Sequence, residues 1–103
     1  DYVEAMWMML QQQTPDDYVI STGETTTVRE FMELVFSFAN LDPYDFLKIN
    51  KRLFRPHEVP YLLGDCTKAK EKLGWKPKYS VKMLAEEMYN SDLEYTRRSL
   101  KDG

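Results

Sequence analysis

Apolar residues recur at helical spacing in four segments of the chain, residues 1–13, 28–40, 67–73 and 81–103. In the first segment the apolar positions that share one face are Val3, Met6, Trp7 and Leu10. Repeats of three and four residues place side chains on the same side of an α-helix. Polar or proline-containing stretches separate the segments, so the pattern predicts four helices.

The ends of three predicted helices carry clear boundary residues. Thr27 and Glu30 have the spacing of a capping box, which places the start of the second helix at Val28. Gly74 follows the third helix at the position where a left-handed backbone commonly ends a helix. Ser80 is the expected N-cap of the last helix.

Three shorter segments have the composition or the alternation of extended chain. They are Tyr18–Ser21, Phe46–Asn50 and Tyr61–Leu63. With the four helices they predict an α/β or α+β module with two or three short strands. A sheet of so few short strands usually packs against a neighbouring structure.

Composition narrows the class of protein. The chain has 103 residues, of which 43% are hydrophobic and 30% charged, as in one soluble globular domain. Its net charge of −3 argues against a general nucleic-acid binder. No apolar stretch approaches the ~18 residues of a membrane span. The single cysteine, Cys66, excludes a disulfide framework and is typical of the reducing cytoplasm, where we expect the protein to be.

Candidate chemistry is sparse. One histidine, His57, and one cysteine are too few for a zinc site, so no metal is expected. Neither a Gly-x-Ser-x-Gly nucleophile motif nor a glycine-rich phosphate loop occurs, so we assign no catalytic residue. The lysines between residues 68 and 78 are expected to form the exposed side of a short helix and its exit loop.

The segment around Arg55 and Glu58 is the one candidate binding site. Pro56 and Pro60 give this segment an irregular backbone that holds its side chains at little ordering cost. A guanidinium suits a diphosphate, and a carboxylate can accept hydrogen bonds from ribose hydroxyls. From the residues alone, a simple ion pair between Arg55 and Glu58 that shapes the segment is the better explanation of the two.

The same segment carries a resemblance. The run RPHEVPYLLGDCTKAKEKLGWKP over residues 55–77 is similar to the C-terminal signature of the GDP-mannose 4,6-dehydratases, which belong to the extended short-chain dehydrogenase/reductase superfamily. Two other stretches, residues 1–7 and residues 22–24 with 28–31, resemble further parts of that family in the same order. The resemblance therefore covers nearly the whole chain.

The resemblance implies that these residues are the C-terminal, GDP-sugar-binding portion of a longer NADP-dependent lyase. The N-terminal Rossmann domain that would bind NADP has no counterpart here, so residues 1–103 alone are expected to bind no cofactor and to be inactive. The implied enzyme converts GDP-mannose to GDP-4-keto-6-deoxymannose, a step of nucleotide-sugar and GDP-fucose biosynthesis. The resemblance also implies that Arg55 contacts the diphosphate and that Glu58 contacts the ribose. It further implies that the enzyme is a homodimer or a homotetramer.

Two alternatives stay open on the sequence. One is a portion of another GDP-sugar reductase or epimerase of the same superfamily, because many dehydratases carry a longer segment between Phe38 and Arg55. The other is a non-catalytic, stand-alone domain that binds a nucleotide or a protein. The chain begins without an initiator methionine or a leader, which suggests processing or a cut from a longer protein.

Overall fold

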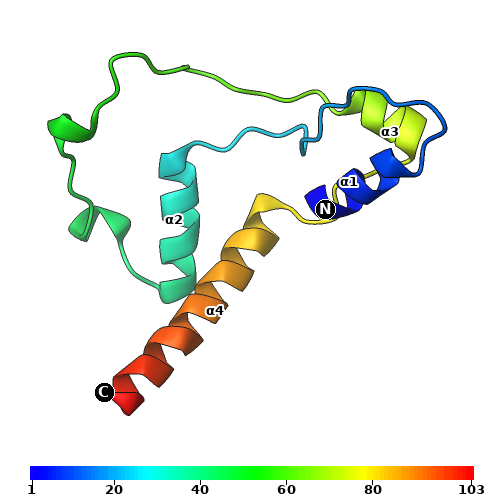
Figure 1. The fold of residues 1–103 in the computed structure, drawn as a ribbon. Helices are drawn as coiled ribbons and strands as arrows, with labels where there is room; N and C mark the ends of the chain where they lie inside the picture. The colour runs from blue at the N-terminus through cyan, green and yellow to red at the C-terminus, as the bar shows by residue number, and fades with distance from the viewer. The chain divides into compact units, whose positions relative to one another are not determined.

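The computed structural model describes residues 1–103 and is helical, with irregular and extended connections (Figure 1). Its elements, in chain order, are α1 (Tyr2–Leu10), α2 (Val28–Ala39), η1 (Pro43–Asp45), η2 (Lys51–Leu53), α3 (Thr67–Leu73) and α4 (Val81–Asp102). The chain divides into two compact units. The first unit contains residues 1–25 and 59–80, and the second contains residues 26–58 and 81–103.

The first unit is organised around a small core between α1 and α3. The buried residues of this core are Ala5, Cys66, Ala69, Leu73 and Trp75. Ala5 and Ala69 have no exposed surface, so the backbones of the two helices can approach closely. Met8 and Met9 pack against the same cluster from α1. Flexible methionines suit this position because they fill irregular gaps.

Asp1 and Trp75 join the two ends of the first unit. The indole Nε1 of Trp75 donates a hydrogen bond of 2.9 Å to the backbone oxygen of Asp1. The Asp1 carboxylate Oδ2 accepts bonds of 3.0 Å from the backbone N–H groups of Lys78 and Tyr79. A buried tryptophan normally needs a partner for its N–H, and here residues more than seventy positions apart supply it.

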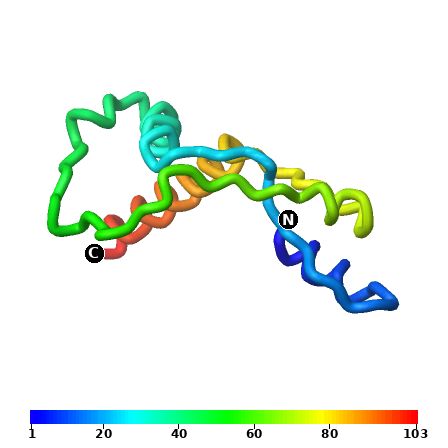
Figure 2. The backbone as a smooth tube through the Cα atoms, turned by 90° about the horizontal axis from the view of Figure 1, so that it is seen from above, coloured from blue at the N-terminus to red at the C-terminus, as the bar shows by residue number.

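Two extended stretches of the first unit, residues 21–25 and 62–64, run side by side, as Figure 2 shows. The Thr25 hydroxyl donates a hydrogen bond to the backbone oxygen of Leu62. At Gly64 the backbone comes so close to Ser21 that an added Cβ would lie 2.5 Å from the Ser21 Cβ. Glycine at this position is therefore required by the close approach of the two stretches.

The second unit consists mainly of α2 packed on α4, with η1 beside α2. The rings of Phe38 and Tyr89 lie 6.1 Å apart between the two helices, and Phe36 lies 5.7 Å from Phe46. Ala85 is the one buried residue of this unit. The predicted helix start is confirmed, because the Thr27 hydroxyl accepts a 3.1 Å bond from the backbone N–H of Glu30.

The predicted fold class is wrong, because the chain contains four α-helices and no strand. Tyr18–Ser21, Phe46–Asn50 and Tyr61–Leu63 are irregular or extended instead. Alternating apolar residues favour an extended backbone, but a strand also needs a ladder of backbone hydrogen bonds to a neighbour. The stretches that do lie together are joined by side-chain contacts, and their backbones form no ladder.

The orientation of α1 also differs from the simplest expectation for an amphipathic helix. Ala5, Met8 and Met9 face the core, whereas the predicted apolar stripe of Val3, Met6, Trp7 and Leu10 is exposed. The spacing of apolar residues shows which of them share a face of a helix. Where two faces of a helix are both apolar, this spacing does not show which face packs against the core.

Candidate functional site

Arg55 and Glu58 lie in an irregular segment of the second unit, after the short helix η2. Asn50 caps η2 by accepting a 3.0 Å bond at Oδ1 from the backbone N–H of Arg52. Phe54 then has an extended backbone with ψ 134°, and Pro56 follows Arg55. The local sequence therefore ends the helical turn and presents both candidate residues in irregular chain, as the prolines predict.

The two candidate side chains are close together and largely exposed. Arg55 Nε lies 3.5 Å from Glu58 Oε1, and the side chains retain 77% and 62% of their accessible surface. This separation exceeds the 2.7–2.9 Å or so of a charge-assisted hydrogen bond. The pair is thus a loose contact, and no hydrogen bond within the chain occupies the guanidinium.

A later part of the run over residues 55–77, from Cys66 to Trp75, supplies the core of the first unit. Cys66, Ala69, Leu73 and Trp75 are buried, and Gly74 ends α3 with φ +68°. The Thr67 hydroxyl donates a hydrogen bond to Asp65 Oδ1, and the Thr67 backbone N–H donates another of 3.0 Å; these two bonds lower the pKa of the Asp65 carboxyl. The run therefore combines residues that build the core with exposed charges, Arg55 and Glu58 among them, that contribute nothing to it.

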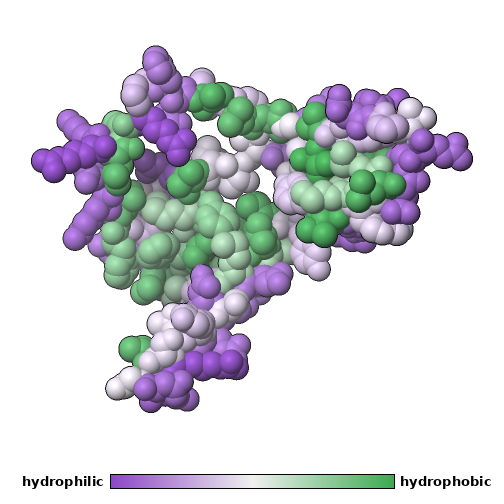
Figure 3. Space-filling view, viewed as in Figure 1, coloured by the Kyte–Doolittle hydropathy of each residue, from purple (hydrophilic) through white to green (hydrophobic).

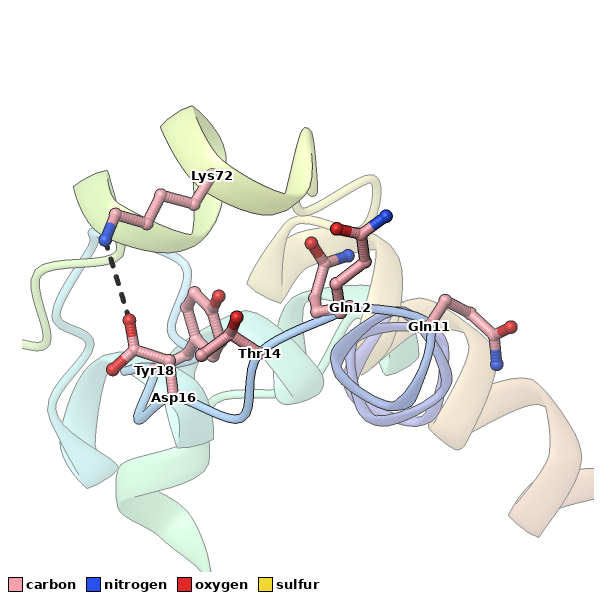
Figure 4. Close-up of a pocket in the computed structure, with 7 residues that line it drawn as sticks. Gln11, Gln12, Thr14, Asp16, Tyr18 and Lys72 are labelled. Carbon is pink, nitrogen blue, oxygen red and sulfur yellow. Dashed lines mark ion pairs between the residues drawn. The ribbon is translucent and has the colours of Figure 1, made fainter.

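A polar pocket of about 640 Å³ lies elsewhere, between the loop after α1 and α3 (Figure 4). Residues Gln11, Gln12, Gln13, Thr14, Asp16, Tyr18 and Lys72 line it. Asp16 lies 2.9 Å from Lys68 Nζ and 3.5 Å from Lys72 Nζ. The hydrogen bond from Lys68, aided by the backbone N–H of Asp17, lowers the pKa of Asp16 from 3.8 to about 2. These pairs attach the loop to α3.

The lysine run is therefore less freely exposed than the sequence suggested. The Lys68 ammonium also lies 5.1 Å from the centre of the Tyr18 ring, and Lys78 Nζ lies 3.1 Å from Glu4 Oε2. The sequence did not identify Asp16 as a partner of these lysines, or Asp1 as an acceptor from the backbone of Lys78. The partners of both residues lie more than fifty positions away, and no local spacing identifies such pairs.

A second charged group in the second unit centres on Tyr44. Its hydroxyl donates to the Glu33 carboxylate and accepts a 3.5 Å bond from Arg29 Nη1. The Arg29 guanidinium also lies 5.9 Å from the centre of the Tyr44 ring. The bond to Tyr44 raises the pKa of Arg29, so this side chain is charged at every relevant pH. The group joins η1 to α2.

The other candidate residues have structural surroundings. Cys66 is buried and precedes α3, as the interpretation of a small core residue predicted. His57 lies in the exposed segment beside Arg55. No group of three histidine, cysteine or acidic side chains is arranged to hold a metal ion. The longest helix is α4, yet neither it nor a shorter one has the length and apolar character of a membrane crossing.

Comparison with known proteins identifies relatives over nearly the whole chain. The profile of the family described as GDP-mannose 4,6 dehydratase matches residues 1–88. The chain is 53% identical over 98 residues to GDP-mannose 4,6 dehydratase 1 of Arabidopsis thaliana. It is 42% identical over 114 residues to the human GDP-mannose 4,6 dehydratase, and 41% identical to that of Sinorhizobium fredii.

These matches include most of this chain but a small part of each relative. They cover 95% of the chain and 27% of the Arabidopsis protein, and 94% of the chain and 31% of the human one. The alignment with the Arabidopsis protein is 98 residues long and the alignment with the human protein is 114 residues long, although both cover nearly the same share of this chain. The Arabidopsis match thus has the length of the matched part of this chain, so the shortness of the chain gives no reason to separate it from the dehydratases. The chain belongs to the GDP-mannose 4,6 dehydratase family.

Proposed function

We propose that this chain is the part of a GDP-mannose 4,6-dehydratase that anchors the GDP portion of the substrate. Arg55 binds the diphosphate, and Glu58 accepts hydrogen bonds from the ribose hydroxyls. The observation that carries the proposal is the division of the run over residues 55–77. Its second part builds the core of the first unit, whereas Arg55 and Glu58 stay exposed and contribute nothing to burial.

The energetics of the Arg55–Glu58 pair are compatible with ligand binding. An exposed ion pair contributes about 0–1 kcal/mol, and less when salt screens it. A hydrogen bond from a guanidinium to a charged group contributes about 1.5–3 kcal/mol. A diphosphate can therefore displace Glu58 from Arg55 with a net gain. Glu58, once displaced, keeps both carboxylate oxygens for the ribose.

The full enzyme in this proposal converts GDP-mannose to GDP-4-keto-6-deoxymannose with loss of water, using NADP. The residues described here do not fit NADP, because no glycine-rich loop precedes any of the helices. We therefore place the cofactor and the catalytic groups in the part of the enzyme beyond these 103 residues. This chain contributes binding energy remote from the reacting carbons, which holds the sugar in position.

A chimera tests the GDP site. The chain replaces the 98 matched residues of Arabidopsis GDP-mannose 4,6 dehydratase 1, and GDP is titrated calorimetrically. Arg55→Ala is expected to weaken GDP binding by about 10- to 150-fold, which corresponds to about 1.5–3 kcal/mol. Arg98→Ala is the matched control, because Arg98 also forms an exposed ion pair, with Glu94. Equal affinities of the two variants for GDP would remove Arg55 from the site.

Glu58 has a separate test in the same chimera. Glu58→Gln keeps the shape of the side chain and removes the charge, so it should weaken GDP binding by several-fold. It should have little effect on binding of 2′,3′-dideoxy-GDP, which lacks the ribose hydroxyls. An equal loss for both nucleotides would show that Glu58 does not contact the ribose.

A further inference from the structure

Helix α1 is apolar on nearly all of its sides, although it is a surface helix. Its nine residues include one charged side chain, Glu4, which forms an ion pair with Lys78. Ala5, Met8 and Met9 face the core of the first unit. Amphipathic surface helices carry polar residues opposite their buried side, whereas a helix that is hydrophobic all round is normally buried.

The side of α1 away from the core is uncovered. Val3, Met6, Trp7 and Leu10, here called the outer stripe, have 77%, 60%, 63% and 81% of their surface exposed. Figure 3 shows hydrophobic residues on the surface at the place of α1 in Figure 1. Four large adjacent side chains form a contiguous apolar patch, and such patches mark interaction sites.

The shares of chain covered indicate what occupies this patch. The match includes 95% of this chain and 27% of the Arabidopsis relative, so most of a dehydratase of that length lies beyond these residues. We infer that the outer stripe of α1 is the surface on which the rest of the dehydratase packs. This inference rests on the proposed function, because it takes the chain as part of that longer enzyme.

The chemistry of the stripe favours an apolar protein surface over a membrane. Helices that lie on membranes carry many lysines and arginines on their polar side. α1 contains no basic residue, and the residues that follow it are the uncharged Gln11, Gln12 and Gln13. The stripe itself contains no charge and, in Trp7, has the type of large anchor that dominates protein interfaces.

A matched pair of leucines in the chimera tests the inference. Leu10 is 81% exposed at the end of α1, and Leu100 is 78% exposed near the end of α4. In the chain alone, Leu10→Ala and Leu100→Ala should have equally small effects on the unfolding temperature. In the chimera, Leu10→Ala should lower that temperature by about 5 °C or more, and Leu100→Ala should leave it unchanged.

Fluorescence quenching provides a second measurement that needs no destabilised variant. The signal of Trp7 is taken as the difference between the unmodified protein and its Trp7→Phe variant. Acrylamide should quench this signal strongly in the chain alone and weakly in the chimera. Equal quenching in the two proteins, or equal temperature shifts for Leu10→Ala and Leu100→Ala, would overturn the inference.

The remaining outcomes are also decisive. If the chimera self-associates and Leu10→Lys but not Leu100→Lys makes it monomeric, a second copy occupies the stripe and the inference fails. All these measurements are made without nucleotide. A chimera in which Leu10 is buried but GDP binding is insensitive to Arg55 would contradict the proposed function and leave the docking surface standing.

Discussion

The two units of the chain bury their residues very differently. Five of the six buried residues, Trp75 among them, lie in the first unit, and the second unit buries Ala85 alone. The second unit nevertheless has more aromatic contacts, with Phe36 near Phe46 and Phe38 near Tyr89. Aromatic content therefore does not determine where a core forms.

The difference follows from the residues at the helix contacts. Alanines at positions 5 and 69 let α1 and α3 approach closely, and Trp75 fills the space beside them with its N–H satisfied by Asp1. In the second unit, α2 and α4 meet through larger side chains such as Phe38 and Tyr89, and only Ala85 is enclosed. We expect stability to depend on a few side chains in the first unit and on many small contributions in the second.

The strongest test of this contrast is the removal of the Trp75 side chain. Trp75→Ala should lower the free energy of unfolding by about 3–5 kcal/mol, because it leaves a cavity and removes the hydrogen bond from the indole to the Asp1 carbonyl. This is a large part of the 5–15 kcal/mol or so that stabilises a typical domain. Trp7→Ala is the control in the chain alone, and it should change stability by under about 0.5 kcal/mol. Urea unfolding measures both, and similar losses would disprove the contrast.

A smaller effect is expected at the close approach between the extended stretches of the first unit. Gly64→Ala places a Cβ 2.5 Å from the Ser21 Cβ and should cost about 1–3 kcal/mol of unfolding free energy. Adding Ser21→Gly removes the atom that clashes, so the double variant should regain most of the loss. Thermal unfolding of the two single variants and the double variant gives the coupling, and strict additivity would rule out the contact.

The start of α2 tests the second unit at a lower magnitude. Thr27→Ala removes the oxygen that accepts from the Glu30 N–H and should cost about 1 kcal/mol. Hydrogen exchange should accelerate at the first amides of α2. Thr26→Ala, at the neighbouring exposed threonine, should leave those amides unchanged. Equal acceleration in both variants would show that the hydroxyl of Thr27 does not cap the helix.

The smallest effect concerns the loop held by Asp16. The folded-state pKa is about 2, below the usual 3.8, so the pairing of Asp16 with Lys68 stabilises the fold above about pH 4. This contribution is lost as the pH falls from about 4 to about 2. Asp16→Asn should flatten the pH dependence of stability in that range, and added salt should reduce the difference.

The control for Asp16 is Asp92→Asn, at an exposed residue of α4 that forms no ion pair. It should leave the slope of stability against pH intact. A slope that is unchanged in Asp16→Asn, measured by urea unfolding at pH 2 to 5, would show that the Asp16 pair does not hold in solution.

Several features were predictable from the sequence because their causes are local. Thr27 caps α2, Gly74 ends α3, and Cys66 is a small residue in the core, as predicted. The family was also predictable, since its characteristic residues follow one another along the chain. The irregular segment that presents Arg55 and Glu58 follows from its prolines in the same way.

The strands and the buried side of α1 were not predictable, because they depend on neighbours. Tyr18–Ser21 has a sequence suited to a strand, but its backbone forms no ladder with the stretch at Gly64 beside it. The outer stripe of α1 is as apolar as the inner side. Local sequence thus determined the helices, their ends and the family. Tertiary structure alone decided which apolar surfaces are covered, because burial is a property of two surfaces and the sequence of one segment specifies only its own.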